Sequence, residues 1–294
     1  MRNSNSQTSI YLVAYHSERD QYRRDCKGQF LAVEQAISAE TWPYDNGDDP
    51  SFYVERNGGR LTWGVCRQEL RTALRTASIV AFFSFTTEPK TARILYRLSA
   101  IATVAERLDH RSVYRDPRLK SKCYINTMIR PLEDGWKYDE NDRPIEARHA
   151  DWLWRMVDHK HIKKEDFEER NASIIRSGSF VEEDVSSGNI KFANNYILFS
   201  DQLNDTYISP DPPLVAFSLK NTHESALDDE LYRLTVDTAK KINGRGYLRV
   251  VNKSGRNVHR HIHFKMQSGE AISWREQLIA KLKERAPKVA PAGG

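Results

Sequence analysis

The residues whose types and spacing point to chemistry lie within 57–75, NGGRLTWGVCRQELRTALR. Arg67, Arg71 and Arg75 recur at every fourth position, so a helix would place them in one stripe. Guanidinium groups on successive turns repel one another unless an anion lies opposite, and a nucleic-acid backbone supplies phosphates at roughly that interval. The spacing therefore predicts phosphate contacts. The alternative is a solvated helix face on which the arginines pair with Glu69 or other carboxylates.

An aromatic strand precedes this basic stripe. The double glycine at 58–59 suits a tight turn, and the following LTWGV alternates as a strand that places Trp63 on the face opposite Cys66. A ring beside a groove can stack on an unpaired or flipped base, which is worth about 1–3 kcal/mol. We predict that Trp63 lines such a base slot, with Tyr53 and Tyr96 as further candidates. The alternative is that Trp63 is a core aromatic.

Cys66 and the histidines of 258–264 are further side chains that could do chemistry. Cys66 as a nucleophile would need a neighbouring base to lower its pKa, and the surrounding sequence offers none. In VHRHIHF, residues 258–264, a strand would place the three histidines on one face, where two imidazoles at i and i+2 can share a metal. A polar sheet face, of a kind that sometimes binds phosphate, is the favoured interpretation. These histidines are His259, His261 and His263.

Residues 180–192, FVEEDVSSGNIKF, carry the residue types of a metal-dependent nuclease. The acids Glu182, Glu183 and Asp184 are separated from Lys191 by Ser-Ser-Gly, so an exposed acidic turn is the favoured interpretation. Glycine-rich phosphate loops, HExxH, GxSxG and kinase signatures are absent from the sequence. We therefore predict no metal and no cofactor, assign no catalytic residue, and expect binding rather than catalysis.

The composition restricts the class of protein. The chain has 294 residues, with Lys+Arg 45 against Asp+Glu 40 and a pI near 9.0, which suits a polyanionic partner without requiring one. The three cysteines are scattered and provide neither a disulfide framework nor a CxxC metal ribbon. This cysteine usage is typical of proteins in a reducing cytosol. The first residues are polar, and no apolar run approaches the roughly 18 residues that span a bilayer. We expect a cytoplasmic protein without a membrane partner.

Hydrophobic periodicity predicts both strands and helices. Residues 93–106 fit either type. Three prolines within 208–217 are expected to end regular structure and close a first domain. Strands are expected at 10–16, 61–65, 78–85 and 191–200, helices at 29–37, from 67 onward, at 224–241 and at 274–285, and a hairpin at 246–264.

The order of these blocks resembles a known family. They resemble the second of the nucleotide-modification-associated domain families in this order: Gly58-Gly59, LTWGVCR, a basic turn, SIVAFFSF, a strand near RILYRLSAI and then VYRDPRLKSK. Those families belong to the PUA-like superfamily, with the EVE, ASCH and SRA modules. The later GNIKFANNYILFSDQL resembles that family's closing segment. The similarity covers roughly residues 10–218. Gln68 departs from it, because the family usually has proline there, and 123–175 is longer and more polar than the family's pattern.

The resemblance implies a curved β-barrel with helices at its rim, which in the superfamily takes a modified base of DNA or RNA into a pocket. It also favours strand at 93–106. We therefore expect an α+β protein with a PUA-like domain at 10–218, a small C-terminal helix–hairpin–helix extension at 219–285 and a disordered tail at 286–294. The expected function is recognition of a modified or flipped base in DNA or RNA. The alternatives are a metal-dependent nucleotide-modifying enzyme or nuclease, and a protein-interaction scaffold.

Overall fold

The chain forms two compact units in a computed structural model of residues 1–294. The described residues of the first unit come from 6–16, 76–104 and 200–286, and those of the second from 50–75, 105–119 and 195–199. In full, the structure describes residues 6–16, 50, 52, 59–64, 67–88, 91, 93–108, 116–119, 195–219, 224–244, 248, 250–251, 257–258 and 261–286.

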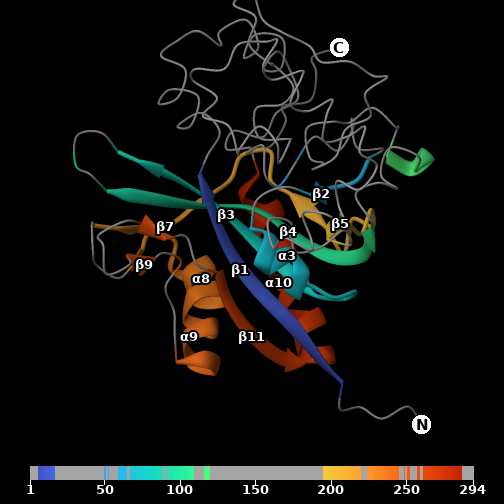
Figure 1. Ribbon diagram of the computed structural model, residues 1–294. Coiled ribbons are helices and arrows are strands. Elements are labelled where there is room, and N and C mark those ends of the chain that lie inside the picture. Colours follow the sequence, from blue (N-terminus) through green and yellow to red (C-terminus); the bar gives the residue numbers. More distant parts are fainter. Residues whose placement is uncertain are drawn as a thin grey trace, which may run out of the picture. The chain divides into compact units, whose positions relative to one another are not determined.

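The first unit is built on a mixed sheet in which β1 (Gln7–His16) lies between β11 (His261–Gln267) and β3 (Ile79–Thr87) (Figure 1). β1 runs parallel to β3 and antiparallel to β11. β3 pairs antiparallel with the long β4 (Ile94–Leu108), so the strand order is β11-β1-β3-β4. Runs such as IVAFFSF form strands because their β-branched and aromatic side chains pack well on a pleated surface.

Short strands continue the sheet beyond β4. Both β6 (Tyr207–Ile208) and β7 (Leu214–Ser218) pair antiparallel with β4, and β8 (Ser225–Ala226) pairs with β7. The β3–β4 register shifts between Phe82 and Phe83, which marks a β-bulge, and bulges bend and twist a strand locally. A separate antiparallel pair joins β9 (Val250–Val251) to β10 (Asn257–Val258).

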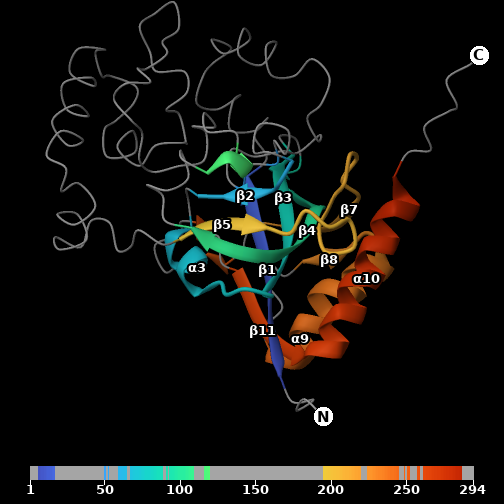
Figure 2. The same ribbon diagram turned by 90° about the vertical axis from the view of Figure 1, so that its right-hand side faces the viewer.

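The core of the first unit lies on one face of this sheet, and the helices cover that face (Figure 2). Alternate residues of each strand reach it, as expected for a sheet with one face against helices. From the sheet the core residues are Ile10, Leu12, Ala14, Ile79, Ala81, Phe83, Phe85, Ile94, Tyr96, Leu98, Ile101, Val215, Ala216, Ile262 and Phe264, and from the helices they are Leu231, Val236, Ala239, Ala271, Trp274, Leu278, Ile279 and Leu282.

In the part of this unit that the structure describes, there is one interrupted helix and one long helix. α8 (Asp229–Tyr232) continues through the π-helical segment η4 (Arg233–Asp237) into α9 (Thr238–Asn243), and α10 (Ser268–Arg285) follows β11. A π segment interrupts the usual i to i−4 hydrogen bonds. The Leu234 carbonyl here accepts a hydrogen bond of 2.6 Å from Trp274 Nε1, which joins η4 to α10.

The second unit contains the pair β2 (Thr62–Trp63) and β5 (Tyr196–Phe199), with α3 (Gln68–Ala73) and the 3-10 turn η1 (Pro117–Leu119). The last residues of β4, 105–108, also belong to it. A small buried cluster of Leu119, Tyr196 and Leu198, with Leu108 packed against it, holds η1 to β5 and to the end of β4.

The α+β class is confirmed, and so are the strands predicted at 10–16, 78–85 and 93–106. In the described residues the sheet is mixed and open, rather than the closed barrel that the resemblance implied. Residues 219–285, predicted as an extension, share a sheet with the first segment, because β11 pairs with β1. The helix predicted at 29–37 lies outside the described residues. No helix within the described ranges is both long and apolar enough to cross a membrane.

Candidate functional site

The three arginines of the expected stripe lie in three different environments. α3 contains only Arg71, because Arg67 is its N-cap residue, with φ 51° and ψ 41°, and Leu74 leaves the helix with ψ 141°. Arg75 lies beyond that end. A single helical stripe needs a continuous helix, so the predicted stripe is wrong.

Arg71 is a buried structural residue. Its exposed fraction is 0%, and one guanidinium nitrogen donates to the Asn195 carbonyl at 2.5 Å, which joins α3 to the chain just before β5. Burial lowers the pKa of Arg71 to about 9, partly offset by the nearby phenol of Tyr196. Arg71 is therefore not on the surface where a phosphate could reach it directly.

Arg67 and Arg75 flank α3 and are more accessible. Burial lowers the pKa of Arg67 to about 10, so its charge is held in a poorly hydrated place. Arg75 is exposed, and its guanidinium donates to the carbonyls of Thr72 at 2.6 Å and Leu74 at 2.9 Å. A cation that binds the last carbonyls of a helix is favoured by the helix dipole, which holds the Arg75 guanidinium at this end of α3.

Arg107, near the end of β4, faces the charge of Arg75. The pKa of Arg107 is lowered first by burial and then by the positive charge of Arg75. The positive charge of Arg75 thus disfavours the charged form of Arg107. Arg107 is not among the predicted site residues, because the predicted strand stopped at 106, whereas β4 continues to Leu108.

Arg118 provides a contrast within the same unit. It forms ion pairs with Glu106 at 2.7 Å and with Asp116 at 2.5 Å. The hydrogen bonds from Arg118 lower the pKa of the Asp116 carboxyl, although burial opposes that shift. The charge of Arg118 is therefore offset by carboxylates, which is a structural arrangement rather than a binding site.

The aromatic candidates are enclosed. Trp63 is 0% exposed and pairs with Ile197 across β2 and β5, so it is the core aromatic that the sequence left open as an alternative. Tyr96, also 0% exposed, belongs to the first unit, where its hydroxyl lies 3.3 Å from the Ser218 hydroxyl. Neither ring is accessible to a base in this conformation. Tyr53 and Cys66 lie outside the described residues.

The histidine strand is present. His261 and His263 share a face of β11, since the Tyr11 ring stacks on His263 at 4.5 Å and lies 5.9 Å from His261. His263 Nε2 is 3.3 Å from the Ser9 hydroxyl. Among the described residues there is no group of three or more His, Cys, Asp or Glu that could hold a metal ion. His259 and the acidic segment 182–184 with Lys191 lie outside them.

Among the described residues of the second unit, arginines outnumber carboxylates, with Arg60, Arg67, Arg71, Arg75, Arg107 and Arg118 against Glu69, Glu106 and Asp116. Over the unit's full sequence, 48–75 and 105–199, basic and acidic residues are equal in number. Any anion site in this unit therefore depends on the local placement of its arginines rather than on net charge. No protein-family model, curated protein or solved structure matches the chain.

Proposed function

We propose that the second unit binds the phosphates of a nucleic acid through Arg75 and Arg107. The observation that carries the proposal is the placement of the exposed Arg75 guanidinium, which the Thr72 and Leu74 carbonyls hold at the end of α3. Its charge also lowers the pKa of Arg107, after the larger effect of burial. A phosphate bound between two guanidinium groups would replace their repulsion with two attractions, and the planar guanidinium matches phosphate oxygens in geometry.

The geometry of Arg75 supports this role. Its contacts with the Thr72 and Leu74 carbonyls fix the guanidinium before any ligand arrives, which reduces the entropy lost on binding. Arg67 at the other end of α3 adds positive charge, and a bound phosphate would offset the cost of its burial. Arg71 instead supports α3 from within.

We extend the proposal to a PUA-like, cytoplasmic protein that recognises a modified or flipped base in DNA or RNA. The support is the resemblance of residues 10–218 to the nucleotide-modification-associated domains. Because Trp63 is 0% exposed, stacking of a base on its ring requires β2 to move from β5. Base recognition therefore predicts a conformational change on binding.

The test is a salt series with labelled DNA and RNA, modified and unmodified. Each phosphate contact contributes about 0.9 to the slope of log affinity against log salt on duplex DNA, so Arg75→Ala with Arg107→Ala should reduce that slope by about 2. Arg118→Gln is the matched control, because Glu106 and Asp116 already offset that charge. An unchanged slope in the double variant would overturn phosphate binding, and equal affinity for modified and unmodified bases would overturn base recognition.

A further inference from the structure

A second surface of interest lies on the first unit, on the sheet face opposite its core. Ile94, Tyr96 and Leu98 of β4 point into the core. Successive side chains of a strand alternate between faces. Leu95 and Arg97 of β4, and Arg93 directly before it, therefore lie on the other face.

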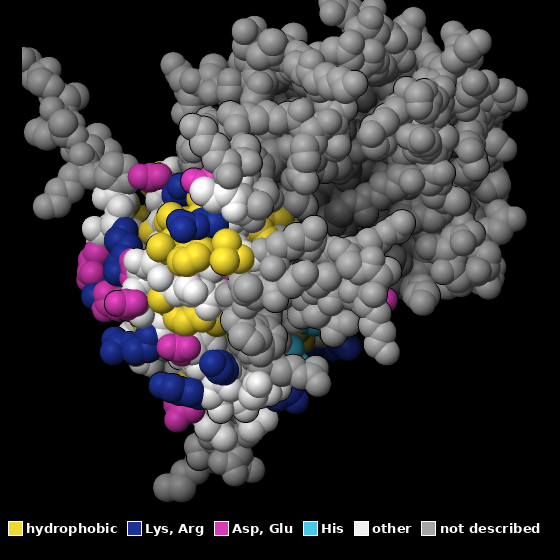
Figure 3. Space-filling view, turned by 90° about the vertical axis from the view of Figure 1, so that its left-hand side faces the viewer, with side chains coloured by type: hydrophobic (Ala, Val, Ile, Leu, Met, Phe, Trp, Pro, Cys, Tyr) yellow, Lys and Arg dark blue, Asp and Glu magenta, His cyan; other side chains and the backbone are white. Residues whose placement is uncertain are grey.

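The neighbouring strands add apolar groups to this face. Phe217 of β7 pairs directly with Leu95, and the Arg93 guanidinium lies 5.0 Å above the centre of the Phe217 ring. Leu219 and Leu227, which follow β7 and β8, are 46% and 49% exposed. Figure 3 shows hydrophobic side chains gathered on the side of the molecule that carries β7, with Lys or Arg side chains lying against them. We call this surface the β7 face: Arg93, Leu95, Arg97, Phe217, Leu219 and Leu227.

We infer that the β7 face binds single-stranded nucleic acid, an inference that rests on the proposed function and adds the class of ligand. A base has a flat apolar face that can stack on a phenylalanine ring or a guanidinium plane, and Arg93 with Phe217 provides both. A duplex hides its base faces in the stack, whereas a single strand exposes them. The arginines on either side of Leu95 suit the phosphates of such a strand.

The positive charges of the β7 face favour a nucleic acid over a second copy of the chain or an apolar protein surface. A symmetric dimer through the face would bring its arginines toward those of a second copy, and like charges across an interface are unfavourable. An apolar protein surface would remove water from Arg93 without supplying an acceptor. Arg97 is held by a 3.1 Å hydrogen bond to the Pro212 carbonyl.

The test compares oligo-dT with a duplex of the same length, by fluorescence anisotropy with the full chain. Phe217→Leu keeps the apolar volume but removes the ring, and Arg93→Gln removes the charge. Each should weaken oligo-dT binding about tenfold, in line with about 1–3 kcal/mol for one stacked base, and leave duplex binding unchanged. Ile272→Ala, which alters an apolar residue of α10 that is 44% exposed, is the matched control.

The outcomes separate this inference from the proposed function. If Phe217→Leu and Arg93→Gln each bind oligo-dT more weakly, the β7 face is supported as the single-strand site. This holds whether or not the Arg75→Ala, Arg107→Ala variant changes the salt slope. Unchanged oligo-dT binding in both face variants overturns the inference, and the proposed function stands if the Arg75 and Arg107 variant still loses its salt dependence. Light scattering tests whether the face instead binds a second copy of the chain. If Phe217→Leu abolishes self-association and leaves oligo-dT binding unchanged, the face belongs to a dimer interface and the inference is overturned.

Discussion

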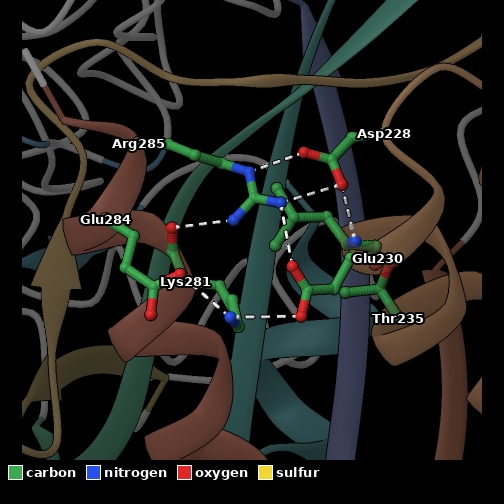
Figure 4. Close-up of polar contacts among 7 residues, drawn as sticks. Asp228, Glu230, Thr235, Lys281, Glu284 and Arg285 are labelled. Carbon is green, nitrogen blue, oxygen red and sulfur yellow. Dashed lines mark hydrogen bonds and ion pairs between the residues drawn. The ribbon is translucent and has the colours of Figure 1, made fainter.

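Asp228 joins α8 to the end of α10 and caps α8 at the same time (Figure 4). Its Oδ1 accepts the Leu231 backbone N–H at 2.9 Å, which is an N-cap bond. Arg285, the last residue of α10, donates to both carboxylate oxygens of Asp228, at 2.6 Å and 3.1 Å. Asp228→Ala removes the cap and the ion pair together, whereas Asp228→Asn keeps a capping oxygen and loses the charge.

The expected costs follow from the two interactions. Loss of an N-cap costs about 1 kcal/mol of stability. The side chains of Arg285 and Asp228 are 25% and 19% exposed and their contact is bidentate, which places the pair near the upper end for surface ion pairs, about 1 kcal/mol. We expect Asp228→Ala to lower the free energy of unfolding by about 2 kcal/mol, and Asp228→Asn and Arg285→Met by about 1 kcal/mol each.

Urea unfolding followed by circular dichroism measures these differences, with the double variant Asp228→Ala, Arg285→Met closing a cycle. Because Arg285 also pairs with Glu230 at 3.2 Å, the double variant should cost slightly more than Asp228→Ala but less than the sum of the two single variants. Costs for Asp228→Ala below about 0.5 kcal/mol, the usual range of surface substitutions, would refute the reasoning. Equal costs for Asp228→Asn and Asp228→Ala would refute the capping role alone.

The same residue makes stability depend on pH. Burial raises the pKa of Asp228, but the hydrogen bonds from Arg285 and from the Leu231 N–H outweigh burial, so the folded-state pKa lies below its usual value of 3.8. A carboxyl with a depressed pKa stabilises the folded protein above its unfolded pKa, and this contribution is lost as the pH falls through the folded pKa. Asp228→Asn should therefore reduce the loss of stability measured below about pH 4.

Three further changes test individual side chains. Arg71→Ala leaves a cavity in the core and should lower the free energy of unfolding by about 2–4 kcal/mol, whereas Arg71→Met fills more of the space and should lower it less. Neither folded variant should alter the salt dependence of nucleic-acid binding. Trp274→Phe removes the hydrogen bond to the Leu234 carbonyl and should cost about 1–2 kcal/mol in urea unfolding. Burial and then Lys265 lower the pKa of His263, so an NMR titration should give a midpoint below 6.5, and Lys265→Met should raise it. Because the unfolded chain takes up this proton first, the stability from His263 should be lost as the pH falls below 6.5 through the folded pKa.

The strands of the first unit could be predicted because their signal is local. The run SIVAFFSF is apolar at nearly every position, and β3 (Ile79–Thr87) is buried on both faces through most of its length. The order of the strands has no such signal. β1 pairs with β11, which is more than 240 residues away in the chain, and that pairing brings the predicted extension into the sheet.

The arginine stripe failed because helix length and burial depend on distant residues. A four-residue period predicts one face only while the helix lasts, and α3 ends at Ala73. Arg71 is enclosed because Asn195, 124 positions along the chain, supplies the carbonyl that binds it. A pattern within 57–75 contains no information about that partner.

The partners of an arginine, more than its spacing, determine what it can do. Arg118 faces two carboxylates, Arg71 faces a carbonyl in the core, and Arg75 faces helix carbonyls and another guanidinium. All three have the same intrinsic charge, and the charge of Arg75 lowers the pKa of Arg107. Arg118→Gln and Arg75→Ala change the net charge of the second unit equally. A difference between their salt slopes would therefore report local geometry, and equal slopes would mean that net charge alone attracts nucleic acid.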